Sequence, residues 1–167
     1  SAGKLVMVVY TPVDVSGFTF AMVTKMDMEE AIVPIIAGRQ NDFFTDYVAE
    51  YGYYDLFLIN EGGRIFYTVA KEADYQTNII SGQFADSSLG EAVREAVSTK
   101  AFAFGDFQPY EPSNGDPAAF IARPILHDGD IELIVAVQLA LDRINEIMQE
   151  RSGMGETGES YLVGPEK

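Results

Sequence analysis

Short turns between apolar runs constrain the fold of this chain more than any other feature of its sequence. A Gly62-Gly63 turn separates the runs 54–60 and 64–69, and Asp128-Gly129 separates the runs 118–126 and 131–141. Gly-Gly and Asp-Gly pairs between apolar runs are typical of tight β-hairpins. Consecutive strands joined in this way favour an antiparallel sheet over a doubly wound parallel one.

Hydrophobic periodicity predicts the remaining elements. They are a hairpin of strands at 4–12 and 18–26, a helix at 88–98, a strand at 102–107, a closing helix from Leu141 and a last strand at 160–163. The central order is therefore a helix, two strands, a helix and then three strands, with five strands between residues 54 and 141. The order predicts an α+β domain of PAS-like shape, in which a long helix packs on a five-stranded antiparallel sheet.

That long helix is expected from about Met28 to Glu50. Asp27 and Glu30 have the spacing of a capping box. The apolar residues between Phe43 and Tyr51 recur at helical intervals. Pro34 is either tolerated early in this helix or marks a break, since proline removes one backbone hydrogen bond.

Composition excludes several classes of function. The 167 residues suit one domain with its own core, and the net charge of −15 comes without any cluster of Lys and Arg. Nucleic acid is therefore not an expected partner, because phosphate binding needs a basic face. The absence of cysteine excludes disulfides and zinc–thiolate sites.

The sequence carries no pattern that predicts catalysis. There is no G-x-S-x-G, phosphate loop or zinc signature. The lone His127 abuts Asp128-Gly129-Asp130 and is expected to be an exposed turn residue rather than a metal ligand or a base. We therefore expect no enzyme activity, no metal and no cofactor.

Three stretches of the sequence resemble a known family. They are "YYDLFLINEGGRIFYTVAKEADYQTN", "FGDFQPYEPSNGDPAAFIARPI" and "GMGETGESYLVGPEK". They resemble the extracytoplasmic double Cache sensor regions of bacterial chemoreceptors and sensor histidine kinases, in the order of the membrane-distal module. The resemblance implies a non-catalytic sensor of a small molecule, of the amino acid, organic acid or amine class, in the extracytoplasmic part of a membrane-anchored receptor.

The resemblance also implies a domain division. Residues 36–150 correspond to the PAS-like Cache sensor domain, and 151–167 to a linker with the first strand of a following module. Residues 1–35 resemble the closing hairpin and the start of the exit helix of a Cache module, which the family places near the end of the sensor region. Either the natural protein carries modules in tandem or the order is rearranged, and 1–35 with 156–167 could form a small second lobe.

In Cache-like domains the ligand lies between the sheet and the loops over it, and ligand pockets combine apolar walls with a few convergent polar groups. The candidate ligand-binding residues chosen on this basis are Tyr67, Lys71, Asp74, Tyr75, Asp106, Tyr110, Phe120, Arg123 and Gln138. Thr68, Thr77 and Asn78 belong to the same polar stretch. Asp74 and Asp106 suit an amine, Lys71 and Arg123 suit an acid, and a zwitterion would use both kinds.

Each candidate also has a structural interpretation. The loop at 71–78 could be solvated, and Asp106 could cap a neighbouring backbone. Arg123 precedes Pro124, which favours an edge strand and an outward side chain. Gln138 needs a partner within an apolar strand, and backbone is the commonest one.

An alternative to ligand sensing is a structural or dimerisation module of a receptor. The aromatic residues of the expected long helix could contact a second copy of the chain. Packing of the same stripe on the domain's own sheet is the interpretation that we favour.

Overall fold

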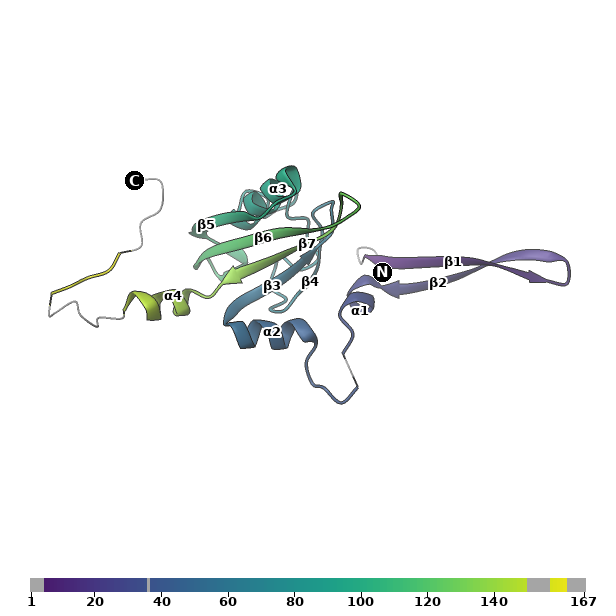
Figure 1. Ribbon diagram of the computed structural model, residues 1–167, viewed down its shortest axis with the longest axis horizontal. Helices are drawn as coiled ribbons and strands as arrows, with labels where there is room; N and C mark the ends of the chain where they lie inside the picture. Colours follow the sequence, from purple (N-terminus) through teal and green to yellow (C-terminus); the bar gives the residue numbers. More distant parts are fainter. Residues whose placement is uncertain (1–4, 36, 150–156, 162–167) are drawn as a thin grey trace.

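The computed structural model describes residues 5–35, 37–149 and 157–161. Its strands and helices follow one another as shown in Figure 1. They are β1 (Val6–Val15), β2 (Phe18–Asp27), α1 (Met28–Ile32), α2 (Phe43–Tyr51), β3 (Tyr53–Ile59), β4 (Ile65–Thr68), α3 (Ser88–Thr99), β5 (Ala103–Pro109), a 3₁₀ turn (Glu111–Ser113), β6 (Pro117–His127), β7 (Asp130–Leu139) and α4 (Leu141–Met148).

The central feature is a five-stranded sheet with the order β4-β3-β7-β6-β5. Every pair of neighbours in it is antiparallel, so the predicted sheet is confirmed. The tight turn at Asp128 (φ 51°) and Gly129 (φ 88°) uses two left-handed residues, as hairpins of this length require. β3 and β7 pair although more than 70 residues separate them, and this pairing joins the two hairpins into one five-stranded sheet.

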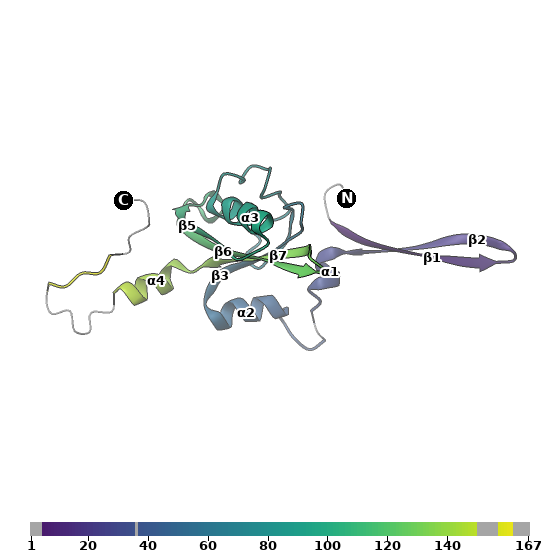
Figure 2. The same ribbon diagram turned by 45° about the horizontal axis from the view of Figure 1, so that its top comes forward.

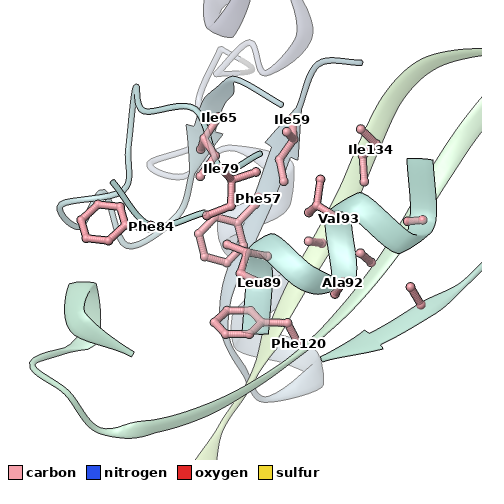
Figure 3. Packing of buried hydrophobic residues seen from close by; sticks show 14 of the residues in the cluster. Phe57, Ile59, Ile65, Ile79, Phe84, Leu89, Ala92, Val93, Phe120 and Ile134 are labelled. Atoms are coloured by element: carbon pink, nitrogen blue, oxygen red, sulfur yellow. The ribbon is translucent and has the colours of Figure 1, made fainter. Parts of the chain in front are cut away.

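Each face of the sheet has its own apolar cluster. α3 covers one face and α2 lies on the other (Figure 2). The cluster under α3 is fully buried (Figure 3). Leu89 of that helix packs there with Phe57, Ile59, Phe120 and Ile134 of the sheet. The second cluster gathers Leu58, Phe66, Tyr67 and Val137 with partly buried residues of α2.

The α3 side packs so closely that a glycine is required on β5. A Cβ atom at Gly105 would lie 2.3 Å from the backbone oxygen of Ser88, at the start of α3. We predict that Gly105→Ala lowers the free energy of unfolding by about 1–3 kcal/mol, because helix and strand must move apart. Urea denaturation would measure this, with Gly62→Ala as the control, since its nearest atom is 3.5 Å away. Equal losses in both variants would contradict the close packing.

The prediction of one long helix from Met28 to Glu50 is wrong. α1 ends at Ile32, and a separate helix, α2, begins at Phe43. Pro34 disfavours helical geometry at the residue before it, and Gly38 (φ 88°) continues the chain in a left-handed turn. Asp42 then caps α2 by accepting hydrogen bonds from the N–H groups of Phe44 (2.8 Å) and Thr45 (3.0 Å).

Most of the aromatic stripe of α2 packs on the domain itself. The ring of Phe44 lies 5.6 Å from that of Tyr67, and Tyr47 stacks 6.2 Å from Tyr53. Phe43 and Tyr51 remain exposed at the two ends of the helix. A dimer through one long helix therefore lacks its structural basis, because that helix does not exist.

The predicted N-terminal hairpin is present and projects from the rest of the molecule (Figure 1). Every residue of β1 is exposed, and β1 and β2 form a sheet of their own. The base of the hairpin is held by Leu5 and Met28, which pack against the second cluster. Residues 157–161 lie at the opposite end of the molecule in both views, and Ser160 and Tyr161 have no strand geometry. The remainder of the strand expected at 160–163 lies outside the described residues.

Candidate functional site

The α3 face of the sheet changes from apolar to polar along its strands. Asp55 of β3 pairs with Gln138 of β7, which pairs in turn with Phe120 of β6. Directly paired residues of neighbouring strands point to the same face, so these three side chains lie side by side at one level. The next level along the same strands is Phe57, Ala136 and Ala122, which is wholly apolar.

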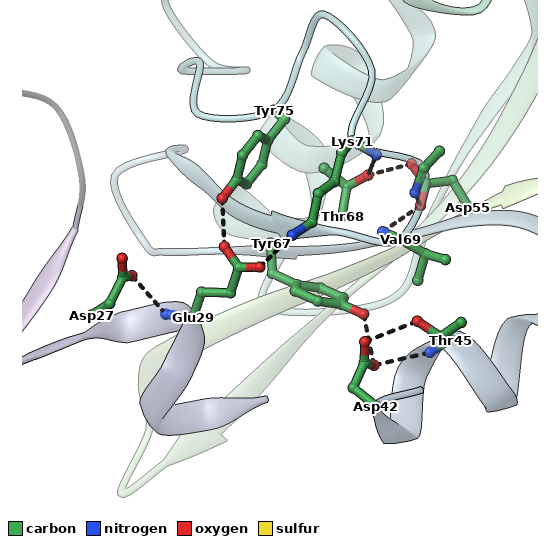
Figure 4. Close-up of polar contacts among 11 residues, drawn as sticks. Asp27, Glu29, Asp42, Thr45, Asp55, Tyr67, Thr68, Val69, Lys71 and Tyr75 are labelled. Carbon is green, nitrogen blue, oxygen red and sulfur yellow. Dashed lines mark hydrogen bonds and ion pairs between the residues drawn. The ribbon is translucent and has the colours of Figure 1, made fainter. Parts of the chain in front are cut away.

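Asp55 fixes the start of the loop that covers this polar level, residues 69–76. It is 0% exposed, and its Oδ2 accepts a hydrogen bond of 2.6 Å from the hydroxyl of Thr68. Its Oδ1 accepts from the N–H groups of Val69 (2.8 Å) and Ala70 (3.0 Å), where the chain leaves β4 (Figure 4). Burial raises the pKa of Asp55, and these hydrogen bonds oppose that shift.

Asp74 lies inside the covering loop and faces Tyr110. Both residues are buried, and the Tyr110 hydroxyl donates to Asp74 Oδ2 at 2.5 Å. The Tyr110 ring packs edge-on against Phe120, with centroids 4.8 Å apart. Burial raises the pKa of Asp74 to about 6, with further contributions from the charges of Asp55 and Glu72, and the Tyr110 bond opposes the shift.

A chain of hydrogen bonds leads from Gln138 to the surface. Its Nε2 donates to Ser113 Oγ at 3.2 Å, and the Ser113 hydroxyl donates to Glu72 Oε2 at 2.8 Å. The other oxygen of Glu72 accepts from the exposed Tyr54 hydroxyl at 2.7 Å. The 3₁₀ turn after Tyr110 positions Ser113 for this role.

Two buried acceptor atoms in this region have no hydrogen-bond partner in the part of the chain that the structure describes. They are Asp74 Oδ1 and Gln138 Oε1, and their residues are 0% and 4% exposed. A buried acceptor without a donor costs about 1–3 kcal/mol, so folded proteins rarely retain one without a reason. Of the two residues, Gln138 lines a cleft and Asp74 does not, so Gln138 Oε1 is the atom that a donor from outside reaches first.

A cleft of about 150 Å³ opens on the network. Tyr54, Ser113 and Gln138 line it, together with Leu141 and Asp142 at the start of α4. A molecule in this cleft would reach the polar level of the sheet on one side and the first turn of the closing helix on the other.

The charge around the network is negative. Asp55, Glu72 and Asp74 lie close enough together for the first two to raise the pKa of the third. The basic residue of the covering loop, Lys71, points away and bonds Glu29 of α1 at 2.7 Å. The site therefore suits a positively charged or donor-rich group.

The structure brings four of the nine candidate residues together. Asp74, Tyr110, Phe120 and Gln138 converge on the polar level, although they come from a loop, the end of a strand and two further strands. Their role in binding stays a prediction.

The other five candidates lie elsewhere. Tyr67 is on the opposite face of the sheet, where its hydroxyl bonds Asp42 at 2.8 Å. Lys71 and Tyr75 lie on the outer side of the covering loop, against α1. Asp106 accepts a hydrogen bond of 2.8 Å from the next N–H in its own strand. Arg123 is exposed and lines a surface hollow with Lys100 and Phe102, away from the polar level.

Asp55, Glu72 and Ser113 were not among the candidates. Asp55 carries a signal that the sequence shows, because it is an acidic residue within the run Tyr53–Ile59 that is otherwise apolar or aromatic. Glu72 and Ser113 carry none, because their partners lie more than 15 residues away along the chain.

Within the described ranges, no group of His, Asp and Glu could hold a metal ion. His127 is largely exposed beside Asp128. Of the helices in those ranges, none is long and apolar enough to cross a membrane.

Of the comparisons with known proteins, the one with solved structures finds a similar protein. No protein-family model and no curated protein matches the chain. Among solved structures, the sensor domain of the V. cholerae histidine kinase DctB is similar, with 16% sequence identity and a TM-score of 0.49. The alignment covers 66% of this chain and 40% of that chain, so this chain spans less than half of that sensor domain.

Proposed function

We propose that the domain is a non-catalytic sensor of a small molecule, in the extracytoplasmic part of a membrane-anchored receptor. The observation that carries the proposal is the pair of unpartnered buried acceptors, Asp74 Oδ1 and Gln138 Oε1. The adjoining cleft supports it, because its lining includes both Gln138 and the first turn of α4. The resemblance of the sequence to Cache sensors supports the receptor context.

The chemistry of the site favours an amine. Both unpartnered atoms are acceptors, and the neighbouring charged groups, Asp55, Glu72 and Asp74, are carboxylates. An ammonium group carries three donors and a positive charge, so it matches both properties. An organic acid would instead add a fourth negative group. Since Arg123 is exposed and away from the network, it does not offset that charge.

A ligand in the cleft would change the position of α4. Leu141 and Asp142 line the cleft, so filling it alters the contacts of the helix that leaves the domain. A ligand that binds one arrangement of α4 better than another shifts their populations by its differential affinity. In a receptor, this shift would pass to the segments that follow.

A thermal-shift screen tests the proposal. We expect small amines such as ethanolamine to raise the melting temperature of wild type, because a ligand that binds only the folded state stabilises it. At a ligand concentration of 100 times the dissociation constant, binding raises the free energy of unfolding by about 2.7 kcal/mol. Glycolate, an acid of similar size, is expected to give no shift.

The matched variants are Asp74→Asn and Asp130→Asn. Both remove one carboxylate, but Asp74 is buried in the network and Asp130 is exposed in β7. We expect Asp74→Asn to abolish the amine-dependent shift and Asp130→Asn to retain it. If a broad set of amines and amino acids leaves wild type unshifted, the domain is better explained as a structural module.

A further inference from the structure

We infer that Glu29 couples the state of the buried site to the N-terminal hairpin, through the loop that covers the site. The inference rests on the proposed function for the nature of the stimulus. The coupling itself follows from contacts on the two sides of that loop, which we call the covering loop and define as residues 69–76.

The covering loop presents different side chains to its two sides. On the inner side, Asp74 bonds Tyr110 and Glu72 bonds Ser113. On the outer side, Lys71 and Tyr75 reach α1 (Figure 4). One residue separates Glu72 from Asp74, and each outer residue is directly adjacent to an inner one. A shift of the loop toward or away from the site must therefore move both outer side chains.

Glu29 receives both outer side chains with its one carboxylate. Its Oε1 lies 2.7 Å from Lys71 Nζ, and its Oε2 accepts a short hydrogen bond from the Tyr75 hydroxyl. The Lys71 ammonium also lies 5.5 Å from the centre of the Tyr75 ring. The Glu29 side chain is 19% exposed and that of Lys71 is 51% exposed, so the carboxylate is the shielded partner of the pair.

A movement of α1 is expected to move the hairpin as well, because no linker separates the two elements. β2 ends at Asp27, and α1 begins at the next residue. The Asp27 carboxylate caps α1 by accepting from the N–H of Glu29 at 3.2 Å, and the N–H of Met28 bonds the carbonyl of Leu5 at 3.0 Å. The base of the hairpin and the first turn of α1 thus form one hydrogen-bonded unit.

A second attachment of α1 does not use the hydrogen bonds of the covering loop. Met28 and Val33 pack in the second apolar cluster with Phe66 and Tyr67 of β4. Val69, at the start of the covering loop, packs against the same cluster, but Lys71, Glu72, Asp74 and Tyr75 do not. Glu29 can therefore be removed without detaching α1, and its contribution to coupling can be separated from its contribution to folding.

The backbone of the covering loop is strained where it turns. Lys71 (φ 52°) and Gln76 (φ 67°) both adopt left-handed geometry, which disfavours residues other than glycine. Such geometry persists only where surrounding contacts impose it. The N–H of Lys71 bonds the Thr68 hydroxyl at 3.0 Å and the N–H of Gln76 bonds the carbonyl of Ile65 at 3.1 Å, so both turns are anchored to β4. The inner and outer side-chain hydrogen bonds act on the segment between these two anchors.

Hydrogen exchange tests the coupling without a ligand. Asp74→Asn perturbs the inner side, and Glu29→Ala removes both outer contacts. We expect Asp74→Asn to change amide exchange in residues 5–33 by on the order of fivefold, a typical coupling between sites. The same substitution in a Glu29→Ala background should leave exchange in residues 5–33 unchanged. Tyr110→Phe removes the same inner bond from the other partner and provides a second perturbation.

Glu30→Ala is the matched control. It removes a carboxylate from the neighbouring position of the same helix, where the side chain is exposed. The response of residues 5–33 to Asp74→Asn should persist in this background. A response confined to the covering loop, or one that survives Glu29→Ala, would overturn the coupling.

The same measurements with a ligand present distinguish the coupling from the proposed function. With ethanolamine as the probe, wild type should show both a thermal shift and altered exchange in residues 5–33, whereas Glu29→Ala should show the shift alone. Thermal shifts with unchanged exchange in residues 5–33 of wild type would overturn the coupling and leave the sensor proposal standing. Loss of all amine binding, with the Asp74→Asn response intact, would overturn the sensor proposal alone.

Discussion

Replacement of Asp55 by alanine is expected to lower the free energy of unfolding by about 3 kcal/mol, because each buried donor left without its acceptor costs about 1–3 kcal/mol. The Asp55 carboxylate accepts hydrogen bonds from the Thr68 hydroxyl and from the N–H groups of Val69 and Ala70. Alanine leaves the buried Thr68 hydroxyl and the half-buried N–H of Val69 without this acceptor. Urea denaturation followed by circular dichroism would measure the loss.

Two variants calibrate this result. Asp55→Asn keeps one acceptor oxygen and the shape of the side chain, so a smaller loss is expected. Asp106→Ala removes a half-buried carboxylate that accepts from a single N–H, that of Phe107, and should cost less than about 1 kcal/mol. If Asp55→Ala were no more costly than Asp106→Ala, the covering loop would not depend on Asp55.

The stability of the domain is expected to fall as pH rises from about 4 to about 6, through the titration of Asp74. Burial raises the pKa of Asp74 to about 6 in the folded chain, from 3.8 for an unperturbed carboxyl group. Between these values the folded chain binds the proton and the unfolded chain does not, so the folded state is favoured at low pH and loses this advantage as pH rises. One unit of pKa shift corresponds to 1.36 kcal/mol, which gives roughly 3 kcal/mol in total.

Asp74→Asn isolates this contribution. The raised pKa of Asp55 and the overall negative charge act in the same direction, so wild type alone does not identify the residue. The difference in unfolding free energy between wild type and Asp74→Asn, measured at intervals from pH 4 to 7, should change by roughly 3 kcal/mol. A difference that stays constant with pH would show that Asp74 is already ionised at pH 4 in the folded chain.

The titration of Asp74 also predicts how the affinity for an amine depends on pH. If an amine pairs with ionised Asp74 as proposed, its binding below pH 6 must displace the proton. Affinity should therefore rise with pH up to about 6 and level off above it.

The sheet could be predicted from the sequence because its signals are local. Asp128-Gly129 and Gly62-Gly63 each lie between two apolar runs, and turns of this length allow antiparallel pairing alone. Pro34 was expected either to be tolerated early in the long helix or to mark a break, and α1 ends at Ile32, two residues before it. The sequence does not show that α2 begins at Phe43, because that start depends on Asp42, which is held by Tyr67 25 residues further along the chain.

The candidate site was only partly predictable. Alternation along a strand indicates which residues share a face, but it does not indicate which face is covered. Arg123 illustrates this limit, since the same strand carries the buried Phe120 toward the site and the exposed Arg123 away from it. Lys71 and Tyr75 were expected as a wall of the pocket, yet they lie on its outer side because α1 offers them a carboxylate.

The sequence by itself therefore determined the strands of the five-stranded sheet, their antiparallel sense and the acidic, cysteine-free character of the chain, because these depend on neighbouring residues and on composition. Only the tertiary structure decided that Asp74 meets Tyr110 across 36 residues, and that Gln138 shares its level with Asp55 across β3 and β7. The physical reason is that both contacts follow from sheet register and loop closure. These are set by the burial of Phe57, Ile59 and Ile134 under α3 and not by any local preference of the polar residues themselves.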